Sequence, residues 1–421
     1  MKNSVYFIFV GLLLSVASCM SRQDRLRKQF GVENENSIVD IKEQIQINDT
    51  FLTITVPDFD PTVVNSLLLE DFIDTLFYIN LETSDDFIVG RIDKMEIVND
   101  TIFILDKTSK QIFTFSMDGK KGYKFGQIGN GPGEYTEPTS MSVSKDYIFV
   151  YDQWQQKVVK FNHKGNVLSD HKLPFFCQKV IMLDDGDMLC FGAGMDNIHL
   201  PKILDYCFWQ CDSAYSKISK KGLFSENIKT IINGNIPLEH YNDRYYYFHD
   251  KTNDFYEILT DGTINHLVHV KFDPDYSEEF YTNLDYRLKE MEENNAVSVG
   301  SFFITNSHII YELSGFGYPN FFFYSKNDGN VKFLNIADEL KSNLTRALHM
   351  TSVVSVYGDW LILNYNAGML LKKVAHYKKE FGDIWAGAPD HVREFDKKLL
   401  ESLHDEDNDI LVFAKLKEHF D

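Results

Sequence analysis

A pattern of two short β runs followed by a glycine turn occurs twice in this sequence, 46 residues apart, and it decides the fold. The second copy reads Tyr147-Ile148-Phe149-Val150-Tyr151-Asp152, Lys157-Val158-Val159-Lys160-Phe161 and Lys164-Gly165. The first copy reads Thr101-Ile102-Phe103-Ile104-Leu105-Asp106, Gln111-Ile112-Phe113-Thr114-Phe115 and Asp118-Gly119. A looser third copy runs from Tyr245 to Gly262. Repeats of about 40 to 50 residues with four strands each are typical of β-propeller blades.

Counting outward from these copies predicts six blades. Five complete four-strand units are expected at about 92–126, 138–173, 177–219, 230–272 and 297–336. A sixth unit offers only three strands, at 352–357, 360–366 and 410–416, with a helical insert between the last two. We expect the run Leu76–Leu81 to supply the missing outer strand and close the ring, because closure removes exposed sheet edges.

Residues 61–421 are therefore predicted to form an all-β, six-bladed propeller. Two amphipathic stretches depart from the β pattern, Ser277–Asn294 and Asp390–His404, and we expect both to be helices packed on the blade surface. In the first, Tyr281, Leu284, Leu288 and Met291 would form the apolar face.

The composition agrees with this architecture and narrows the function. Hydrophobic residues make up 44% of the chain, and its 34 Phe and 22 Tyr against only 10 Pro favour strands. The formal net charge of −20 argues against a nucleic-acid partner, since the phosphate backbone would be repelled.

The N-terminus predicts export and lipid attachment. Lys2 precedes a short apolar stretch from Val5 to Val16, and the small residues Ala17 and Ser18 stand directly before Cys19. This run resembles a bacterial lipobox, which implies that residues 1–18 are a signal peptide and that Cys19 carries the lipid. The alternative is an ordinary signal peptide with an accidental cysteine.

Residues 19–60 are then expected to form a tether with one short strand near residues 51–56. No other stretch approaches the roughly 20 apolar residues of a membrane span. The predicted location is the bacterial cell envelope, on its periplasmic face or at the cell surface, with the lipid as the only membrane attachment.

The glycine-rich run beginning at Phe125 carries a family resemblance. Phe125-Gly126-Gln127-Ile128-Gly129-Asn130-Gly131-Pro132-Gly133-Glu134-Tyr135, with the strand that ends in Asp152, is similar to the NHL-type repeat. It resembles in particular the six-bladed propeller lipoproteins of Bacteroides-like bacteria. The resemblance covers about residues 70–421 and implies a fold and an envelope location, without catalytic residues to carry over.

The motifs that could signal a cofactor, metal or active site are weak. A phosphate-binding loop needs Lys and Ser or Thr after its last glycine, whereas Glu134 and Tyr135 follow here, so we interpret the run as a crossing between blades. The acidic turn at 405–409 lacks the later glycine and glutamate of a calcium loop. His266 and His269 are predicted to point to opposite faces of a strand. We expect no cofactor, no metal and no catalytic residue.

Four cysteines remain beyond the signal: Cys177, Cys190, Cys207 and Cys211. Cys207 and Cys211 are about 13 Å apart on a strand, too far for one disulfide. Cys190 and Cys207 could face each other on neighbouring strands. Free buried thiols are the default expectation.

Propeller topology places the crossings between blades and the loops between second and third strands on one face. The candidate ligand-binding residues on this loop-rich face are Glu134, Tyr135, Trp154, Tyr318 and Trp385. Exposed aromatics beside carboxamides such as Gln153 and Gln155 suit sugar or peptide recognition.

Two functions remain open. The first is a binding or scaffold lipoprotein that presents this face to a glycan, peptide or envelope protein. The second is a propeller enzyme, a lactonase, lyase or glycan-processing hydrolase, with its site in the channel. A ring of acidic, amide or histidine side chains on the inner strands would indicate the enzyme. The inner strands expected at 94–98 and 140–143 do not resemble such a ring, which favours binding.

Overall fold

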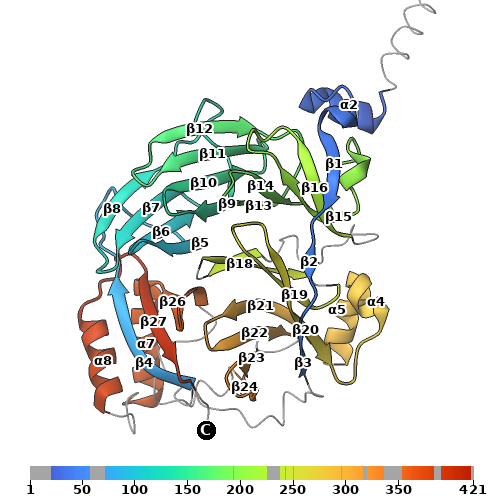
Figure 1. Cartoon of the computed structure of the whole chain (residues 1–421). Coiled ribbons are helices and arrows are strands. Elements are labelled where there is room, and N and C mark those ends of the chain that lie inside the picture. The colour runs from blue at the N-terminus through green and yellow to red at the C-terminus, as the bar shows by residue number, and fades with distance from the viewer. Residues whose placement is uncertain are drawn as a thin grey trace, which may run out of the picture.

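The computed structural model describes residues 20–56, 72–192, 194–224, 238–241, 243–249, 251–294, 296–315, 320–335, 353–383 and 390–418. Within these ranges the chain forms six β-sheets, each built on four antiparallel strands and arranged as the blades of a propeller (Figure 1). The predicted six-bladed, all-β fold is confirmed. Cys19, Tyr318 and Trp385 lie outside the described residues.

The first three blades follow the predicted spacing. Blade 1 contains β5 (Lys94–Val98), β6 (Thr101–Asp106), β7 (Gln111–Ser116) and β8 (Lys121–Phe125). Blade 2 contains β9 (Pro138–Val143), β10 (Tyr147–Asp152), β11 (Lys157–Asn162) and β12 (Val167–Lys172). Blade 3 contains β13 (Lys179–Met182), β14 (Met188–Phe191), β15 (Tyr206–Cys211) and β16 (Ile218–Phe224), with the 3-10 helix η2 (Pro201–Ile203) between β14 and β15.

The last three blades complete the ring. Blade 4 contains β17 (Leu238–Tyr241), β18 (Arg244–His249), β19 (Asp254–Ile258) and β20 (Ile264–Phe272). Blade 5 contains β21 (Ser298–Ile304), β22 (His308–Ser314), β23 (Asn320–Ser325) and β24 (Val331–Asn335). Blade 6 contains β25 (Val353–Tyr357), β26 (Trp360–Tyr365) and β27 (Ile410–Leu416) from the C-terminal end, and β4 (Ile73–Asn80) from the N-terminal end.

The ring closes as predicted, through an N-terminal strand. β4 pairs antiparallel with β27, with Leu76 opposite Ala414 and Asn80 opposite Ile410. Figure 1 shows blue β4 beside red β27, so the two ends of the ring meet within one sheet. Blade 6 thereby gains an outer strand that its own C-terminal sequence does not supply.

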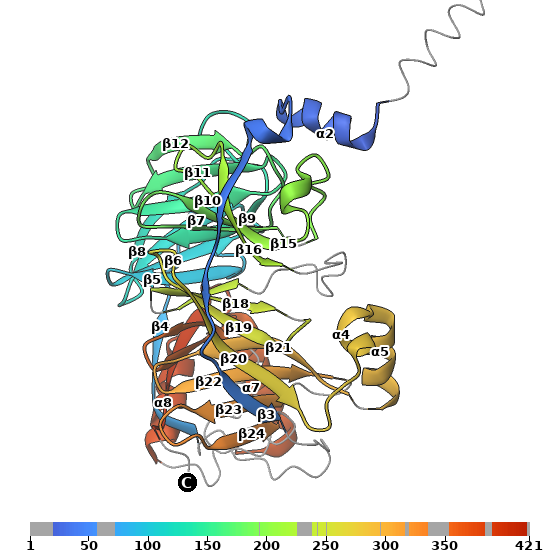
Figure 2. The same ribbon diagram turned by 45° about the vertical axis from the view of Figure 1, so that its right-hand side comes forward.

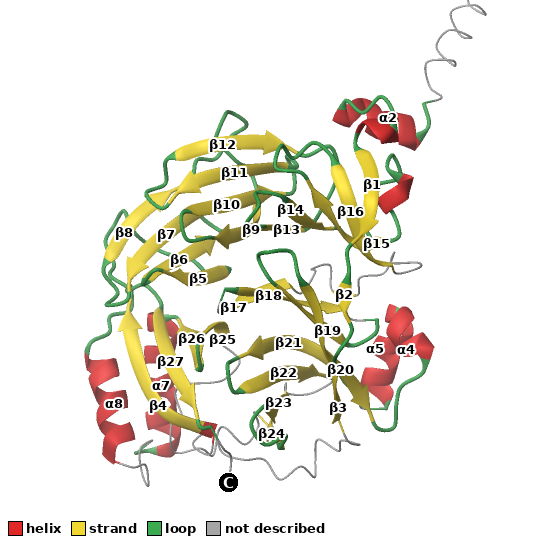
Figure 3. Cartoon of the chain, in the orientation of Figure 1, coloured by secondary structure: helices red, strands yellow, loops and turns green. Residues whose placement is uncertain are grey.

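The strand order in every blade places its first strand at the centre of the ring. β5, β9, β13, β17, β21 and β25 surround the middle of the molecule (Figure 3). Each of these inner strands begins where a crossing from the previous blade arrives. The start of an inner strand and the end of the following strand therefore lie on the loop-rich face.

Apolar side chains fill the spaces between neighbouring blades. Each space joins buried residues of two blades, as in Phe103 with Val150, Tyr151 with Trp209, Phe208 with Tyr247, Phe255 with Tyr311, and Ile104 with Phe413. The core is thus a series of layers between sheets, and the centre of the ring is lined by both polar and apolar side chains.

The segment before the ring differs from the expected tether with one short strand. After α2 (Arg22–Phe30) and η1 (Glu35–Ser37), it forms β1 (Val39–Gln44), β2 (Ile47–Asn48) and β3 (Leu52–Val56). β1 pairs in parallel with β16, and β2 and β3 pair in parallel with β20, so the segment crosses the outer edges of blades 3 and 4 (Figure 2). Val39, Ile54 and Val56 are buried by this pairing. We call residues 39–56 the strap.

The expectation that His266 and His269 point apart is wrong. The ladder between β19 and β20 shifts register between Phe255 and Tyr256, and this irregularity brings both rings to one carboxylate oxygen of Asp254, at 3.0 and 2.9 Å. Asp49 of the strap also bonds His266 at 2.9 Å, and Phe51 stacks on the same ring. These contacts hold the strap against blade 4.

The helices match the prediction in place but only partly in detail. The stretch Ser277–Asn294 is broken into α4 (Glu278–Thr282) and α5 (Leu284–Glu293) by Asn283, which ends one helix and caps the next. The break changes the helical phase, so Phe280 and Arg287 are buried while Leu288 is 47% exposed. The blade 6 insert forms α7 (Ala367–Phe381) and α8 (Asp390–Glu401), and Leu399 and Leu403 are buried.

The four cysteines of blade 3 are free and buried. Cys190 on β14 lies opposite Trp209 on β15, so it does not face Cys207. Cys177, Cys190 and Cys211 share one apolar cluster, whereas Cys207 belongs to another. The default expectation of free thiols holds in this structure.

Candidate functional site

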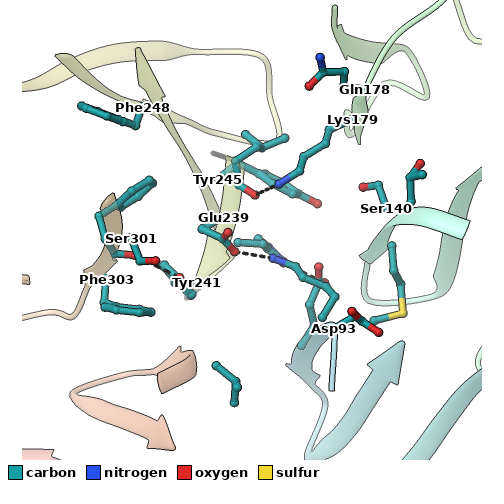
Figure 4. A pocket seen from close by; sticks show the side chains of 18 of the residues that line it. Asp93, Ser140, Gln178, Lys179, Glu239, Tyr241, Tyr245, Phe248, Ser301 and Phe303 are labelled. Atoms are coloured by element: carbon teal, nitrogen blue, oxygen red, sulfur yellow. Dashed lines mark hydrogen bonds and ion pairs between the residues drawn. The ribbon is translucent and has the colours of Figure 1, made fainter. Parts of the chain in front are cut away.

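A cavity of about 730 Å³ occupies the centre of the ring. All six inner strands contribute to it, and so do Lys107 and Gln153, which directly follow the second strands of blades 1 and 2. Because those two positions lie on the loop-rich face, the cavity extends to that face. The cavity in the predicted channel therefore reaches the predicted loop-rich face. Figure 4 shows side chains that line the cavity.

An ion pair links opposite sides of this cavity. Lys94, the first residue of β5, lies 3.0 Å from the carboxylate of Glu239 on β17. Burial opposes both charged forms, but each charge stabilises the other. The pKa of Lys94 is raised by Glu239 and Glu96, and the pKa of Glu239 is lowered by Lys94 and Lys179. Both groups are therefore ionised at neutral pH.

Lys179, the first residue of β13, is a second lysine at this level. Its Nζ donates to the carbonyl oxygen of Leu238 at 3.1 Å (Figure 4). Burial lowers the pKa of Lys179 to about 8; Glu239 opposes the shift, and Lys94 and Lys107 reinforce it. Three lysines thus lie close enough to repel one another in a chain whose net charge is −20. Within the described ranges, neither Lys107 nor Lys179 has a carboxylate oxygen within 4.0 Å of its ammonium group. Glu239 stabilises the charge of Lys179 from a greater distance.

Deeper polar contacts join blades 1, 2 and 4. One oxygen of Glu96 accepts from the backbone N–H of Val143 at 2.8 Å and lies 2.9 Å from Nδ1 of His240. The His240 ring stacks on Tyr245, whose hydroxyl lies 2.5 Å from that of Ser142. The Glu96 side chain is 1% exposed, and its other oxygen, Oε1, has no hydrogen-bond partner among the described residues. A buried carboxylate oxygen without a donor is unusual in a native structure.

The other charged residues of the lining are largely engaged. Asp93 pairs with Arg91 and accepts from the backbone N–H of Lys107. The Arg287 guanidinium of α5 donates to the carbonyl oxygens of Phe280 and Tyr281. Glu312 of β22 faces the cavity from blade 5. The carboxylates Asp93, Glu96 and Glu239 therefore each have a basic partner.

The residues predicted from sequence fall in different places. Trp154 is 77% exposed, and it directly follows Gln153 of the cavity lining. Tyr135 is completely buried between blades 1 and 2, which removes it from the exposed face. The Glu134 carboxylate accepts from the backbone N–H of Gly131 at 2.8 Å, so it stabilises its own loop. Tyr318 and Trp385 lie outside the described residues.

The glycine-rich run is a crossing between blades, from β8 to β9. Asp152 at the end of β10 accepts hydrogen bonds from the N–H groups of Thr136, Glu137, Trp154 and Gln155, and thus joins the crossing to the neighbouring loop. Burial opposes ionisation of Asp152, but these donors hold its pKa below the usual value. Asp106 binds the N–H groups of Gly90, Thr108 and Ser109 in the same way. The repeated aspartates therefore stabilise the loops.

The sequence did not identify the lysines of the cavity or Glu239. Lys94 and Lys107 come from blade 1, Lys179 from blade 3 and Glu239 from blade 4, so the linear sequence does not place them together. The available signal was a charged residue at the start of an inner strand, as at Lys94 and Lys179. Among the described residues, no group of His, Cys, Asp and Glu side chains is arranged to hold a metal ion. No helix in the described part of the chain is both long and apolar enough to cross a bilayer.

Comparison with a solved structure from Bacteroides fragilis agrees with the fold. A candidate exported protein from Bacteroides fragilis is similar with a TM-score of 0.69 and 20% identity, over 87% of this chain and 100% of that chain. A DUF4221 family member from Bacteroides vulgatus has a TM-score of 0.47 and 9% identity, over 82% and 97%. No curated protein matches the sequence. The family profile described as "Domain of unknown function (DUF4934)" matches residues 53–415, from the strap to the last strand of the ring, and the chain belongs to this family.

Proposed function

We propose that this protein is a binding propeller of the bacterial cell envelope, anchored by a lipid on Cys19, which takes a glycan or peptide ligand through its loop-rich face. The ligand would enter the central cavity, and Trp154 would contact it at the mouth. The anchor and the location rest on the N-terminal sequence, where small residues precede Cys19 after a short apolar stretch.

The observation that carries the binding role is the polar lining of the cavity. A volume of about 730 Å³ is in the range of small-molecule sites. A ring that needed its centre only for packing would be filled by apolar side chains, yet lysines, carboxylates and amides converge there from several blades. Polar groups converging in a concave, largely preformed site are typical of ligand binding.

Blocking the cavity tests this proposal. Ser301 on β21 lines the cavity and is exposed, so Ser301→Trp would fill the space without displacing a buried side chain. We expect Ser301→Trp to abolish binding to the ligand found on a glycan or peptide array, while Ser301→Ala retains it. Equal binding by both variants at equal thermal stability would contradict a cavity site.

The role of the mouth is tested separately. Trp154→Ala should leave the melting temperature unchanged, since the side chain is 77% exposed, and should weaken binding to the same ligand. Unchanged affinity would remove Trp154 from the site.

Lipid attachment is tested by Cys19→Ala. We expect the variant to remain uncleaved or to become soluble after cell fractionation. Normal processing together with unchanged membrane partition would contradict the anchor.

A further inference from the structure

We propose that the cavity binds a sugar that carries an oxyanion, either a carboxylate or a sulfate ester. The oxyanion would contact Lys107 and Lys179, and a ring hydroxyl would donate to Glu96. This inference rests on the proposed function, because it names the ligand class for the same cavity.

The first observation is the lysine cluster at the mouth. Lys94 has a carboxylate partner, Glu239, but Lys107 and Lys179 have no carboxylate oxygen within 4.0 Å among the described residues. Burial disfavours the charged form of Lys179, and Lys94 and Lys107 add to this effect although Glu239 opposes it, so a charged Lys179 is unfavourable in the empty protein. An oxyanion between them would relieve this repulsion and form charge-assisted hydrogen bonds.

The cluster also stands out against the rest of the chain. A protein with a formal charge of −20 repels anions over most of its surface. The carboxylates nearest the mouth, Asp93 and Glu239, are already paired with Arg91 and Lys94. Glu312 faces the cavity from blade 5, and Arg287 donates to backbone carbonyls of α4. The unpaired charge near Lys179 is therefore positive.

The second, independent observation is the free oxygen of Glu96. Its Oε1 atom is buried without a donor, although Oε2 is bonded to both Val143 and His240. A buried acceptor left unpaired is unfavourable, so a ligand that brings a donor gains from filling it. Since Glu96 lies two residues deeper along β5 than Lys94, the ligand needs an anionic end near the mouth and a hydroxyl further in. Acidic sugars have both groups on one rigid ring.

The experiment uses the mature chain and three probes at matched ionic strength, because salt screens the interaction. Calorimetric titration would compare glucuronate, glucose 6-sulfate and neutral glucose. We expect at least one acidic sugar to bind about tenfold or more tightly than glucose, as charge-assisted hydrogen bonds predict. The two acidic sugars distinguish a carboxylate from a sulfate ester.

Matched variants locate the contact. Lys179→Met should weaken binding of the acidic sugar by about tenfold or more. Lys326→Met is the control, because Lys326 also donates to a backbone carbonyl, that of Thr305 at 2.7 Å, and desolvation also lowers its pKa, but it does not line the cavity. Glu96→Gln should weaken binding of the sugar but leave binding of inorganic sulfate unchanged.

Three results would overturn the inference: no saturable binding of either acidic sugar in the millimolar range, equal affinity for glucose, or equal effects of Lys179→Met and Lys326→Met. A neutral array ligand that Ser301→Trp excludes would also overturn it, while leaving the proposed function intact. An array ligand that Ser301→Trp does not affect would instead contradict the proposed cavity site.

Discussion

Lys94 and Glu239 form an ion pair of 3.0 Å although they lie 145 residues apart, on the inner strands of blades 1 and 4, which are opposite each other in a ring of six. Glu96 and His240 repeat the connection at 2.9 Å one step deeper on the same two strands. Side chains from opposite blades therefore meet across the middle of the ring at two levels.

The first prediction concerns the stability of the empty pocket. The pKa of Lys179 is about 8 in the folded protein, below its ordinary value of 10.5, so the unfolded chain binds the proton more tightly. The free energy of unfolding therefore rises with pH between about 8 and 10.5, and below that range burial of the protonated lysine destabilises the fold. We expect Lys179→Met to raise the melting temperature at pH 7 by a few degrees, with a smaller gain at pH 10.

Thermal denaturation of both proteins at several pH values checks this. The exposed Lys164→Met serves as a control and should show no pH-dependent difference from the wild type. A melting temperature that falls in Lys179→Met at pH 7 would mean that Lys179 stabilises the fold.

The second prediction is the pH dependence of anion binding. Lys179 attracts an oxyanion only while it is protonated. Burial, Lys94 and Lys107 lower its pKa, and Glu239 raises it. Affinity for an acidic sugar should therefore fall as the pH rises above about 8, by up to tenfold per pH unit if this proton is essential. Titrations between pH 6.5 and pH 9.5 measure it. In Lys179→Met the slope should disappear.

The third prediction concerns the crossing between blades 1 and 2. Gly126 has a φ of +114°, and a Cβ atom there would lie 2.0 Å from the hydroxyl oxygen of Tyr135. Gly126→Ala should lower stability by well over the roughly 1 kcal/mol expected from backbone strain alone. Gly31→Ala is the matched control, because Gly31 also has a positive φ, +64°, but nothing within 4 Å of the added atom.

Tyr135→Phe should partly rescue Gly126→Ala. The Tyr135 hydroxyl has no hydrogen-bond partner among the described residues, so its removal sacrifices no bond and opens space for the new methyl group. Urea denaturation of the single and double variants measures the coupling. Additive effects would contradict a direct clash.

The fourth prediction concerns the strap. Asp254 accepts from both His266 and His269, and Asp49 and Phe51 of the strap contact His266. Asp254→Ala removes the carboxylate bonded to both rings and leaves His266 with Asp49 alone, which should cost about 1–3 kcal/mol. Hydrogen exchange should then speed up in β3 and leave blade 1 unchanged. The exposed Asp261→Ala, at the β19–β20 turn, controls for loss of a carboxylate in the same blade.

The fifth prediction concerns ring closure. A chain beginning at about residue 85 lacks β4 and leaves β27 as an exposed apolar edge, so it should aggregate or melt far below the full chain. A chain beginning at residue 72 lacks only the N-terminal segment with the strap and should keep a closed ring. Equal melting of the two truncated chains would contradict the closing role of β4.

The ring could be predicted from sequence because its signal is local and repeated. Asp106 and Asp152 recur at the same place in neighbouring blades, where each fixes its loops by hydrogen bonds, and Gly119 and Gly165 recur in turns with a positive φ. The strap was harder to predict because β1 is mostly polar and gains its order only from the edge of β16.

The site could not be predicted in the same way. Lys94, Lys179 and Glu239 come from three blades, and only the closed ring brings them together. Tyr135 was predicted to be exposed because its position in a loop does not reveal that its side chain packs between two blades. The pairing of His266 and His269 depends on a register shift that strict strand alternation does not contain.

The pairing of β4 with β27 also sets an order of events in time. β4 leaves the ribosome, or passes through an export channel, more than 300 residues before its partner does, because residue 80 pairs with residue 410. Until then β4 is an apolar strand without a neighbour, and blades 1 to 5 can form while the sheet that joins the two ends waits for the last strand. A shortened or stalled chain would contain most of the blades and still have two open edges, which is the form that chaperones and proteases recognise.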